Sequence, residues 1–487
     1  MSASEAVLVP YTEILRQECP RHVVWIQESP PIAKRSYQSG AGKSALINAV
    51  FGIEGATPVS HRTPGVHDID KPFSFPQNDR IIIHDSQGFE PGEEGNIQTV
   101  SDFIRRRSEM PALADQLHAI WVCAEIPFAG GRLFERGVER ILLEYWGNLP
   151  IIVVFTKLDV LRVAQENKLE KQLEQRGEEM DDNEFEAELD TIVAATVQDL
   201  CVKPLCDLTP SEPPKWVATS TTDPRYKTTI ADLVNLALEI TKIENVWIEM
   251  AIAQRSSAQA SIDASIRVGR KRYWRGLISD IFLGFTMRSV LEVLQKDIVN
   301  VWNMHDPEKH LQKPEFLALL SVLVEDISDE ATNNYPLTEK AVKAIIDNPA
   351  AIIIAGPTAV VVLFAEWVRG TYKKTKSSVR CLIAFIVDLT LTMDTLFYLV
   401  LSRGQTPIKI ALVNSALRIY NSRKAPVHAS IKAWVDGWGT FGHLDADVVI
   451  KKIAGIIADN SVKPEQWGMR EEGSDESWMS LDALRET

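Results

Sequence analysis

The sequence predicts an α/β domain built on a mostly parallel sheet, followed by an all-helical domain. In the first half, short apolar runs rich in β-branched and aromatic residues alternate with helical stretches, as in a parallel sheet covered by helices. From about Ile243 onward, long stretches have helical spacing and few strand signals. The chain has 487 residues, of which 45% are apolar, so it is globular and long enough for two or three domains.

Five apolar runs are expected to form the sheet: His22–Ile26, Ile81–His84, Leu117–Ala124, Ile151–Phe155 and Trp216–Ala218. Each run is short and apolar on both faces, as a strand buried between two helix layers should be. The expected organisation is an N-terminal extension over residues 1–21, an α/β domain over 22–242, a helical domain over 243–463 and a disordered acidic tail over 464–487.

Charge and cysteine content exclude several classes of protein. The net charge of −14 disfavours general nucleic-acid binding, which needs clustered Lys and Arg to neutralise phosphates. The five cysteines form no C-x-x-C pair, as expected for reduced thiols inside the cell. The first thirty residues lack a basic segment followed by an apolar one, so no signal peptide is predicted and a cytoplasmic location is expected.

Two apolar segments raise the question of membrane contact. Ala350–Ala365 is uncharged but only 16 residues long, whereas a spanning helix needs roughly 20. Cys381–Leu401 is longer, but Asp388 and Asp394 lie inside it, and its apolar residues recur at three- and four-residue spacing. Core packing is therefore favoured for both segments, and peripheral membrane association stays open as the alternative.

The strongest local signal is a glycine-rich segment that runs into a predicted helix. It reads Ser39-Gly40-Ala41-Gly42-Lys43-Ser44, followed by Ala45. Glycines let backbone N–H groups close around phosphate oxygens, and the N-terminus of the helix adds partial positive charge. In this pattern Lys43 reaches the β- and γ-phosphates and Ser44 is a Mg²⁺ ligand. The segment predicts a P-loop NTPase three-layer sandwich.

Two further elements belong to the phosphate side of such a site. Asp85-Ser86-Gln87-Gly88 follows the run Ile81–His84, so Asp85 would hold Mg²⁺ through water and Gly88 would contact the γ-phosphate through its N–H. Thr63 lies between this element and the glycine-rich segment, where a threonine would reach both Mg²⁺ and the γ-phosphate. An ordinary Thr-Pro turn is the alternative for Thr63.

The third element predicts which base is recognised. Thr156-Lys157-Leu158-Asp159 follows the run Ile151–Phe155 directly. The carboxylate of Asp159 can accept from both N1–H and the 2-amino group of guanine, whereas adenine lacks that amino group. The stem of Lys157 would cover the base plane. After the last run, Thr219 and Ser220 could supply backbone contacts to the guanine O6.

With these motifs in this order, the segment from about Val23 to Thr241 resembles the translation-factor-related class of P-loop GTPases. Its DSQGF sequence resembles septin-like and Era-like G domains more than small Ras-like ones, and LHAIWVC followed by FTKLD resembles uncharacterised fungal G-domain proteins. The resemblance implies binding of GTP or GDP with Mg²⁺, with Lys43, Thr63 and Gly88 acting on the γ-phosphate.

The sequence departs from this family at three points. Tyr37 stands where the first glycine of the loop is expected, and Gln27–Arg35 intervenes between the first apolar run and the loop. Three explanations are open for residues 27–37: a tolerated insertion, a degenerate pseudo-GTPase, or a mis-joined reading frame or retained intron, which is favoured. Phe89 replaces the glutamine that orients water in Ras-like proteins, so slow hydrolysis is expected.

The favoured function is a slow, Mg²⁺-dependent GTPase that acts as a switch or assembly protein. A protein partner, or self-association through the G domain or the helical half, would then be needed. Two alternatives remain. One is a pseudo-GTPase that serves as a protein-interaction module, and the other is a membrane-associated remodelling GTPase that uses Ala350–Ala365.

Overall fold

Contacts within the computed structural model group the chain into two units. We call Glu13–Ala260 the sheet unit, and Met1–Thr12 together with Ser261–Thr487 the helical unit. The residues that the structure describes are 10–18, 22–27, 43–53, 69–85, 94–127, 130–144, 146–147, 149–271, 277, 282, 285–327, 375–403, 407–439 and 445–463.

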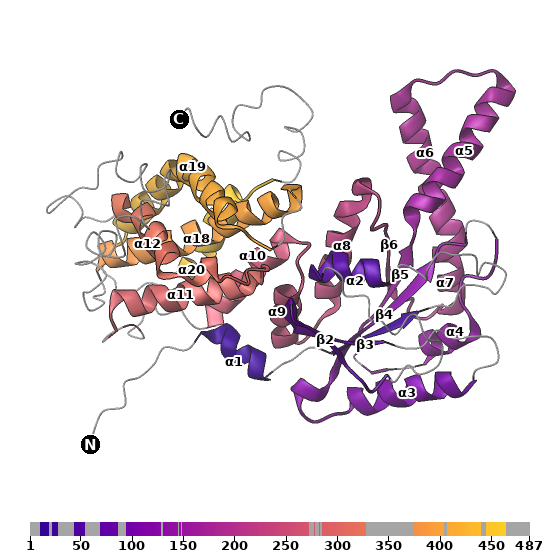
Figure 1. Ribbon diagram of the computed structural model, residues 1–487, viewed down its shortest axis with the longest axis horizontal. Coiled ribbons are helices and arrows are strands. Elements are labelled where there is room, and N and C mark those ends of the chain that lie inside the picture. Colours follow the sequence, from indigo (N-terminus) through magenta and orange to yellow (C-terminus); the bar gives the residue numbers. More distant parts are fainter. Residues whose placement is uncertain are drawn as a thin grey trace. The chain divides into compact units, whose positions relative to one another are not determined.

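The sheet unit is built on a six-stranded sheet in the order β2-β3-β1-β4-β5-β6 (Figure 1). Its strands are β1 (His22–Gln27), β2 (Phe73–Phe75), β3 (Asn78–Asp85), β4 (Leu117–Glu125), β5 (Ile151–Thr156) and β6 (Lys215–Ala218). All neighbours pair in parallel except β2, which is antiparallel to β3. The five apolar runs of the sequence lie within β1 and β3 to β6, and β2 has no counterpart among them.

Helices cover both faces of this sheet. The helices of the unit are α2 (Lys43–Phe51), α3 (Glu94–Ser108), α4 (Arg136–Leu143), α5 (Leu158–Arg176), α6 (Asp182–Val197), α7 (Lys203–Leu208), α8 (Lys227–Ile240) and α9 (Glu244–Ala253). Helix α1 (Tyr11–Glu18) has its first two residues in the helical unit and the rest in the sheet unit. Because side chains alternate along a strand, Ile120 and Val122 of β4 join the core that α3 to α7 cover, whereas Trp121 faces α2, α8 and α9.

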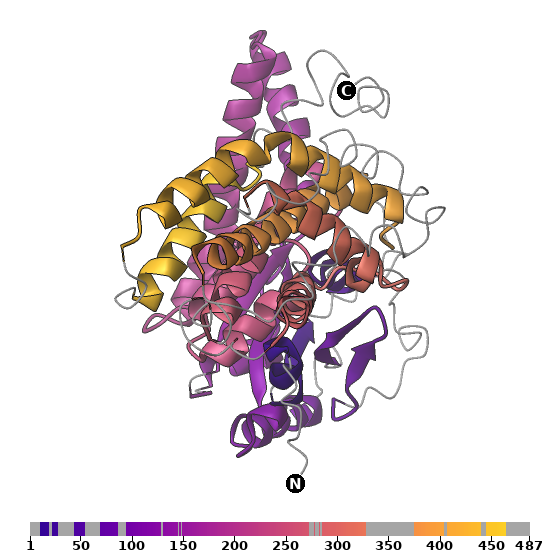
Figure 2. The same cartoon turned by 90° about the vertical axis from the view of Figure 1, so that its left-hand side faces the viewer.

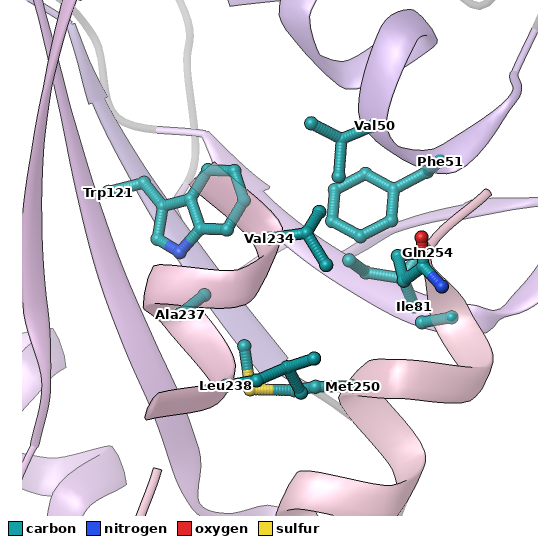
Figure 3. A pocket seen from close by; sticks show the side chains of 10 residues that line it. Val50, Phe51, Ile81, Trp121, Val234, Ala237, Leu238, Met250 and Gln254 are labelled. Atoms are coloured by element: carbon teal, nitrogen blue, oxygen red, sulfur yellow. The ribbon is translucent and has the colours of Figure 1, made fainter. Parts of the chain in front are cut away.

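A narrow apolar pocket lies on the face of the sheet that α2, α8 and α9 cover (Figure 3). Trp121 of β4 and Phe51 of α2 approach each other there with ring centroids 6.1 Å apart. Leu238 of α8 and Met250 of α9 close its other side. By these contacts α9 belongs to the sheet unit, although the sequence places it in the helical domain. The change at Ile243 marks the end of strand-forming sequence and not the end of packing on the sheet.

The charged segment between β5 and β6 forms a helical hairpin. In Figures 1 and 2, α5 and α6 extend away from the sheet, and in Figure 1 they lie closer together near the sheet than at their far ends. Gly177 ends α5 at φ 63°, and the side chain of Asp181 caps α6 by accepting from the N–H groups of Asn183 and Glu184. Arg162 of α5 is buried and bonds Glu186 and Asp190 of α6, which fixes the two helices together.

The C-terminal end of α2 is held by two side chains. The carboxamide of Asn78 donates to Phe51 O at 2.9 Å and to Ala253 O at 2.7 Å. The guanidinium of Arg255 donates to Gly52 O at 3.2 Å and to Gln77 O at 2.6 Å. Phe51 O and Gly52 O are carbonyl groups that the end of α2 leaves unbonded, and the charge of Arg255 complements the helix dipole.

Gly52→Ala is expected to destabilise the sheet unit by about 2 kcal/mol or more. Gly52 has φ +60°, which costs a residue with a Cβ about 1–2 kcal/mol, and a Cβ there would lie 2.6 Å from Cδ of Arg255. Gly177 has φ +63°, but a Cβ added there would meet nothing within 4 Å, so Gly177→Ala measures the backbone cost alone. Urea denaturation of both variants gives the difference, and equal midpoints would show that Arg255 moves aside freely.

Every described element of the helical unit is helical. The bounds are α10 (Ala258–Lys271), α11 (Met287–Trp302), α12 (Pro314–Leu323), α18 (Lys376–Arg403), α19 (Ile410–Asp436) and α20 (Ala446–Asn460), with short helical turns η7 (His310–Gln312) and η8 (Glu325–Ile327). Helix α18 is the centre of this unit, because it packs against α11, α12, α19 and α20. Figure 2 shows α18 and α19 side by side.

Among the described helices, α18 is the one long and apolar enough to cross a membrane, and 89% of its most apolar window is buried within the protein. It contains the Cys381–Leu401 segment, for which the sequence favours core packing. The other apolar segment, Ala350–Ala365, and the tail over 464–487 lie outside the described residues.

Candidate functional site at the carboxyl edge of the sheet

The carboxyl ends of five parallel strands meet at one edge of the sheet. These ends are Gln27, Asp85, Glu125, Thr156 and Ala218. Strand β1 lies between β3 and β4, so the chain leaves β1 toward one side of the sheet to form β3 and later crosses to the other side to form β4. Open α/β sheets bind their ligands outside the carboxyl ends at such a reversal of strand order.

The Thr156–Asp159 loop is held in an unusual backbone conformation. Thr156 ends β5, is buried, and donates its hydroxyl to Ala124 O at 3.3 Å. Lys157 adopts φ 62° and ψ 38°, a left-handed conformation that few residues with a side chain occupy without support from their surroundings. Helix α5 begins at the next residue, so the turn from strand to helix is made by Lys157 alone.

The support comes from the loop after β6. Leu158 N donates to Thr219 O at 3.2 Å, and Thr219 N donates to Phe155 O at 2.8 Å. These two bonds extend the pairing of β5 and β6 beyond the last paired residues. The Thr156–Asp159 and Thr219–Ser220 segments, about 60 residues apart in the sequence, are thereby fixed to each other by backbone contacts.

The side chain of Asp159 is oriented by a residue of the loop after β6. The hydroxyl of Thr222 donates to Asp159 Oδ2 at 2.8 Å. Thr222 is itself fixed, because its N–H donates to Ser220 Oγ at 3.2 Å. The start of the same loop is held by a hydrogen bond of 2.7 Å between the hydroxyls of Thr219 and Thr229. An ionised carboxylate is an acceptor with two oxygens, so Asp159 suits a ligand that presents two neighbouring N–H donors.

The side chain of Lys157 extends in the opposite direction, toward β4. Its Nζ donates to Glu125 Oε2 at 2.8 Å, and the two side chains are 27% and 28% exposed. Glu125 ends β4 and is the register partner of Thr156. Glu125 and Asp159 thus have different partners at this edge, since Glu125 pairs with Lys157 and Asp159 accepts from Thr222.

Helix α2 points its N-terminus at the same edge. Its C-terminal Phe51 O bonds Asn78, the first residue of β3, so α2 runs antiparallel to the strands and begins toward their carboxyl ends. Lys43 and Ser44 form its first turn, where unpaired N–H groups and the helix dipole favour an anion. Ala45 follows on the exposed side of the helix.

The structure describes part of the predicted site. It brings Thr156, Lys157, Asp159, Thr219 and Ser220 together, with their side chains. For Lys43, Ser44 and Asp85 it places the backbone, at the start of α2 and the end of β3. The predicted residues Ser39, Gly40, Ala41, Gly42, Thr63 and Gly88, together with Tyr37 and Phe89, lie outside the described residues.

The histidine that precedes Asp85 is buried, and burial favours its neutral form. Burial lowers the pKa of His84, and this effect outweighs the hydrogen bond to the backbone of Ile69, which acts to raise it. His84 Nδ1 lies 2.8 Å from Ile69 O, and the ring packs on Phe103 with centroids 4.8 Å apart. His84 thus anchors the end of β3 within the core.

Two residues of the site were not predicted from the sequence. Glu125 and Thr222 belong to no recognised motif, and each acquires its role from a neighbouring strand or loop. Thr222 had a weak signal, since it follows Thr219 and Ser220 within a run of hydroxyl residues. Glu125 had one only if β4 and β5 were known to pair.

Comparison with known protein families gives a match in the helical unit. A family model described as a domain of unknown function (DUF8505) matches residues 310–472, which lie in the helical unit. A comparison with curated proteins gives no match.

Proposed function

We propose that the protein binds guanine nucleotides at the carboxyl edge of the sheet and that the sheet unit is a P-loop NTPase-type G domain. One observation carries the proposal: the Lys157–Asp159 turn and the Thr219–Thr222 loop are bonded to each other at neighbouring strand ends. The strand reversal at β1 and the N-terminus of α2 at the same edge support the placement of the phosphates.

In this proposal Asp159 reads the base. Its carboxylate accepts from N1–H and the 2-amino group of guanine, while Thr222 keeps it in the required orientation. Adenine presents an acceptor at N1 and no 2-amino group, so it would leave the carboxylate without donors. Lys157 covers the base plane, and backbone groups of Thr219 and Ser220 face the O6.

The phosphates are assigned to the segment Ser39–Ala45, and Lys43 and Ser44 at the start of α2 favour their charge. Mg²⁺, which neutralises phosphate charge in such sites, would be held by Ser44, Thr63 and Asp85. Thr63 and Gly88 would contact the γ-phosphate. The backbone positions of Ser44 and Asp85, at a helix start and a strand end of one edge, fit this assignment.

Hydrolysis of GTP is proposed to be slow, because Phe89 follows Gly88 where a water-orienting glutamine would stand. The protein would then act as a cytoplasmic switch or assembly protein that needs a partner or a second copy. Tyr37, which stands where the first glycine of the loop is expected, is the reason for one alternative, a pseudo-GTPase that binds other proteins through its helical unit. A membrane-associated remodelling GTPase that uses Ala350–Ala365, which lies outside the described residues, is the second alternative.

Titration of the purified full chain with fluorescent GDP, GTP and ATP, with and without Mg²⁺, tests the proposal. We expect guanine nucleotides to bind in a Mg²⁺-sensitive manner and at least about 100-fold more tightly than ATP, because two N–H donors are matched to one carboxylate. A folded sample that binds none of the three would exclude the G-domain function and leave the interaction module. Rapid GTP turnover by dilute protein would exclude slow hydrolysis and leave the proposed guanine-nucleotide binding intact.

A further inference from the structure

The lysine of the base-reading loop is stretched between two neighbouring strands. On the β6 side, the turn that contains Lys157 is fixed by the bond from Leu158 N to Thr219 O at 3.2 Å. On the β4 side, Nζ of Lys157 is fixed by Glu125 at 2.8 Å. The aliphatic stem therefore crosses the end of β5 along the sheet edge.

The direction of this crossing places the stem beside the proposed nucleotide. Strand β4 lies between β5 and β1, and β1 leads into the glycine-rich segment assigned to the phosphates. A lysine held toward β4 is therefore held toward the phosphate side of the site. Both partners are a little over one-quarter exposed, so the pair is open to a ligand and is not part of the core.

We propose that Glu125 is a positioning residue that holds the Lys157 stem in the orientation that covers the guanine base. This inference rests on the proposed function. A free lysine side chain populates many rotamers and loses that freedom when a ligand immobilises it. Glu125 removes this freedom before the nucleotide arrives, and affinity rises because less ordering remains to be done on binding.

A structural role for the pair would appear as a loss of folding stability when the pair is removed. Ion pairs with this much exposure contribute little to folding, so we expect loss of the pair to leave the melting temperature almost unchanged. A positioning role concentrates the effect in nucleotide affinity and makes that effect depend on Lys157. Glu125 and Lys157 should therefore act as one unit on binding and as nearly independent residues on stability.

The test is GDP binding by the full chain in a double-mutant cycle of Glu125→Gln and Lys157→Ala. We expect Glu125→Gln to weaken GDP binding about tenfold, mainly through faster dissociation, with a melting temperature close to that of the unchanged protein. In the Lys157→Ala background the same substitution should change affinity by less than about twofold. The exchanged pair Glu125→Lys with Lys157→Glu should restore the ion pair but not the affinity.

A matched control is Glu139→Gln, which removes an ion pair of similar length from the same unit, between Glu139 and Arg132 at 3.0 Å. It should leave GDP affinity unchanged. Equal GDP affinity of Glu125→Gln and the unchanged protein would overturn the inference while the proposed function stands. So would a tenfold loss that persists without Lys157. Failure of the unchanged folded protein to bind any guanine nucleotide would remove the proposed function and this inference together.

Discussion

Asp159→Asn is expected to weaken GDP and GTP binding by at least about 100-fold and to create binding of xanthine nucleotides. The carboxylate offers two acceptors to the two N–H donors of guanine, and a hydrogen bond to a charged group contributes about 1.5–3 kcal/mol. The asparagine amide offers one acceptor and one donor. The donor would meet the 2-amino group of guanine, whereas xanthine carries a carbonyl at that position and matches the amide.

The fold should tolerate this substitution. Thr222 donates to Asp159 Oδ2, and an amide oxygen can accept the same bond. Asp159 lies in the first turn of α5, where loss of a negative charge costs about 0.3–1 kcal/mol through the helix dipole. Asp182→Asn, in the first turn of α6, removes an equivalent charge away from the site and is the matched control.

Competition binding with GDP, xanthosine diphosphate and ADP distinguishes the outcomes. If Asp159→Asn loses GDP without gaining the xanthine nucleotide, Asp159 supports the loop but does not read the base. If Asp182→Asn loses GDP as well, the effect is one of general charge. An unchanged GDP affinity in Asp159→Asn would contradict the assigned orientation of the base.

The strands were predictable where apolar sequence is continuous. β4 and β5 are buried on both faces between helix layers, so nearly every residue must be apolar, and the run is visible in the sequence. Strand β2 has three residues, pairs with one neighbour and is flanked by Pro72 and Pro76. An antiparallel edge strand of this length leaves no periodic pattern to detect, and β3 rather than local preference determines it.

The site residues likewise divide into those that the sequence predicts and those that only the structure identifies. Thr156, Lys157 and Asp159 were predictable because their spacing is local and follows one strand. Glu125 and Thr222 were not, because their partners are supplied by the pairing of β5 with β4 and β6. The left-handed conformation of Lys157 is likewise invisible in the sequence, since bonds from the Thr219 loop stabilise it.

The helical unit gives a related result for the acidic residues of α18. Asp388 and Asp394 interrupt an apolar segment and argue against a simple spanning helix, but the sequence does not identify their partners. Asp388 accepts from Tyr420 and lies 3.0 Å from His428 Nε2, and Asp394 accepts from Val462 N at 2.6 Å. These partners lie more than thirty residues away in α19 and after α20.

A second large effect is expected in the helical unit, which should lose about 3 kcal/mol of stability as pH rises from about 6.5 to 9. His428 of α19 bridges two carboxylates, Asp326 of η8 at 2.8 Å from Nδ1 and Asp388 of α18 at 3.0 Å from Nε2. Burial acts to lower the pKa of His428, but the two carboxylates outweigh it and raise the pKa to about 9. The other titratable groups at this cluster are Tyr420, which donates to Asp388, and Lys424, which pairs with Asp326 at 3.3 Å.

The sign follows from the two proton affinities. The folded state holds the proton of His428 up to about pH 9, whereas the unfolded chain releases it near 6.5. The stabilisation is therefore complete below about 6.5 and is lost as pH rises through 9, and a difference of this size corresponds to about 3 kcal/mol. Burial also raises the pKa of Asp394 to about 7. The stability that comes from protonated Asp394 is therefore lost as pH rises from about 4 to 7, a range below that of His428. Measurements between about pH 7 and 9 thus report mainly on His428.

Hydrogen exchange of α18 and α19, corrected for the intrinsic pH dependence, measures this effect within the helical unit. Protection should fall between about pH 7 and 9 in the unchanged protein. His428→Gln should remove that pH dependence and destabilise the unit by about 3 kcal/mol at about pH 7, because the fully buried Asp388 loses its charged partner. His310→Gln, another buried histidine of the same unit, should retain the pH dependence. A pH dependence that survives in His428→Gln would assign it to another group and show that the bridge between η8, α18 and α19 does not depend on a charged imidazole.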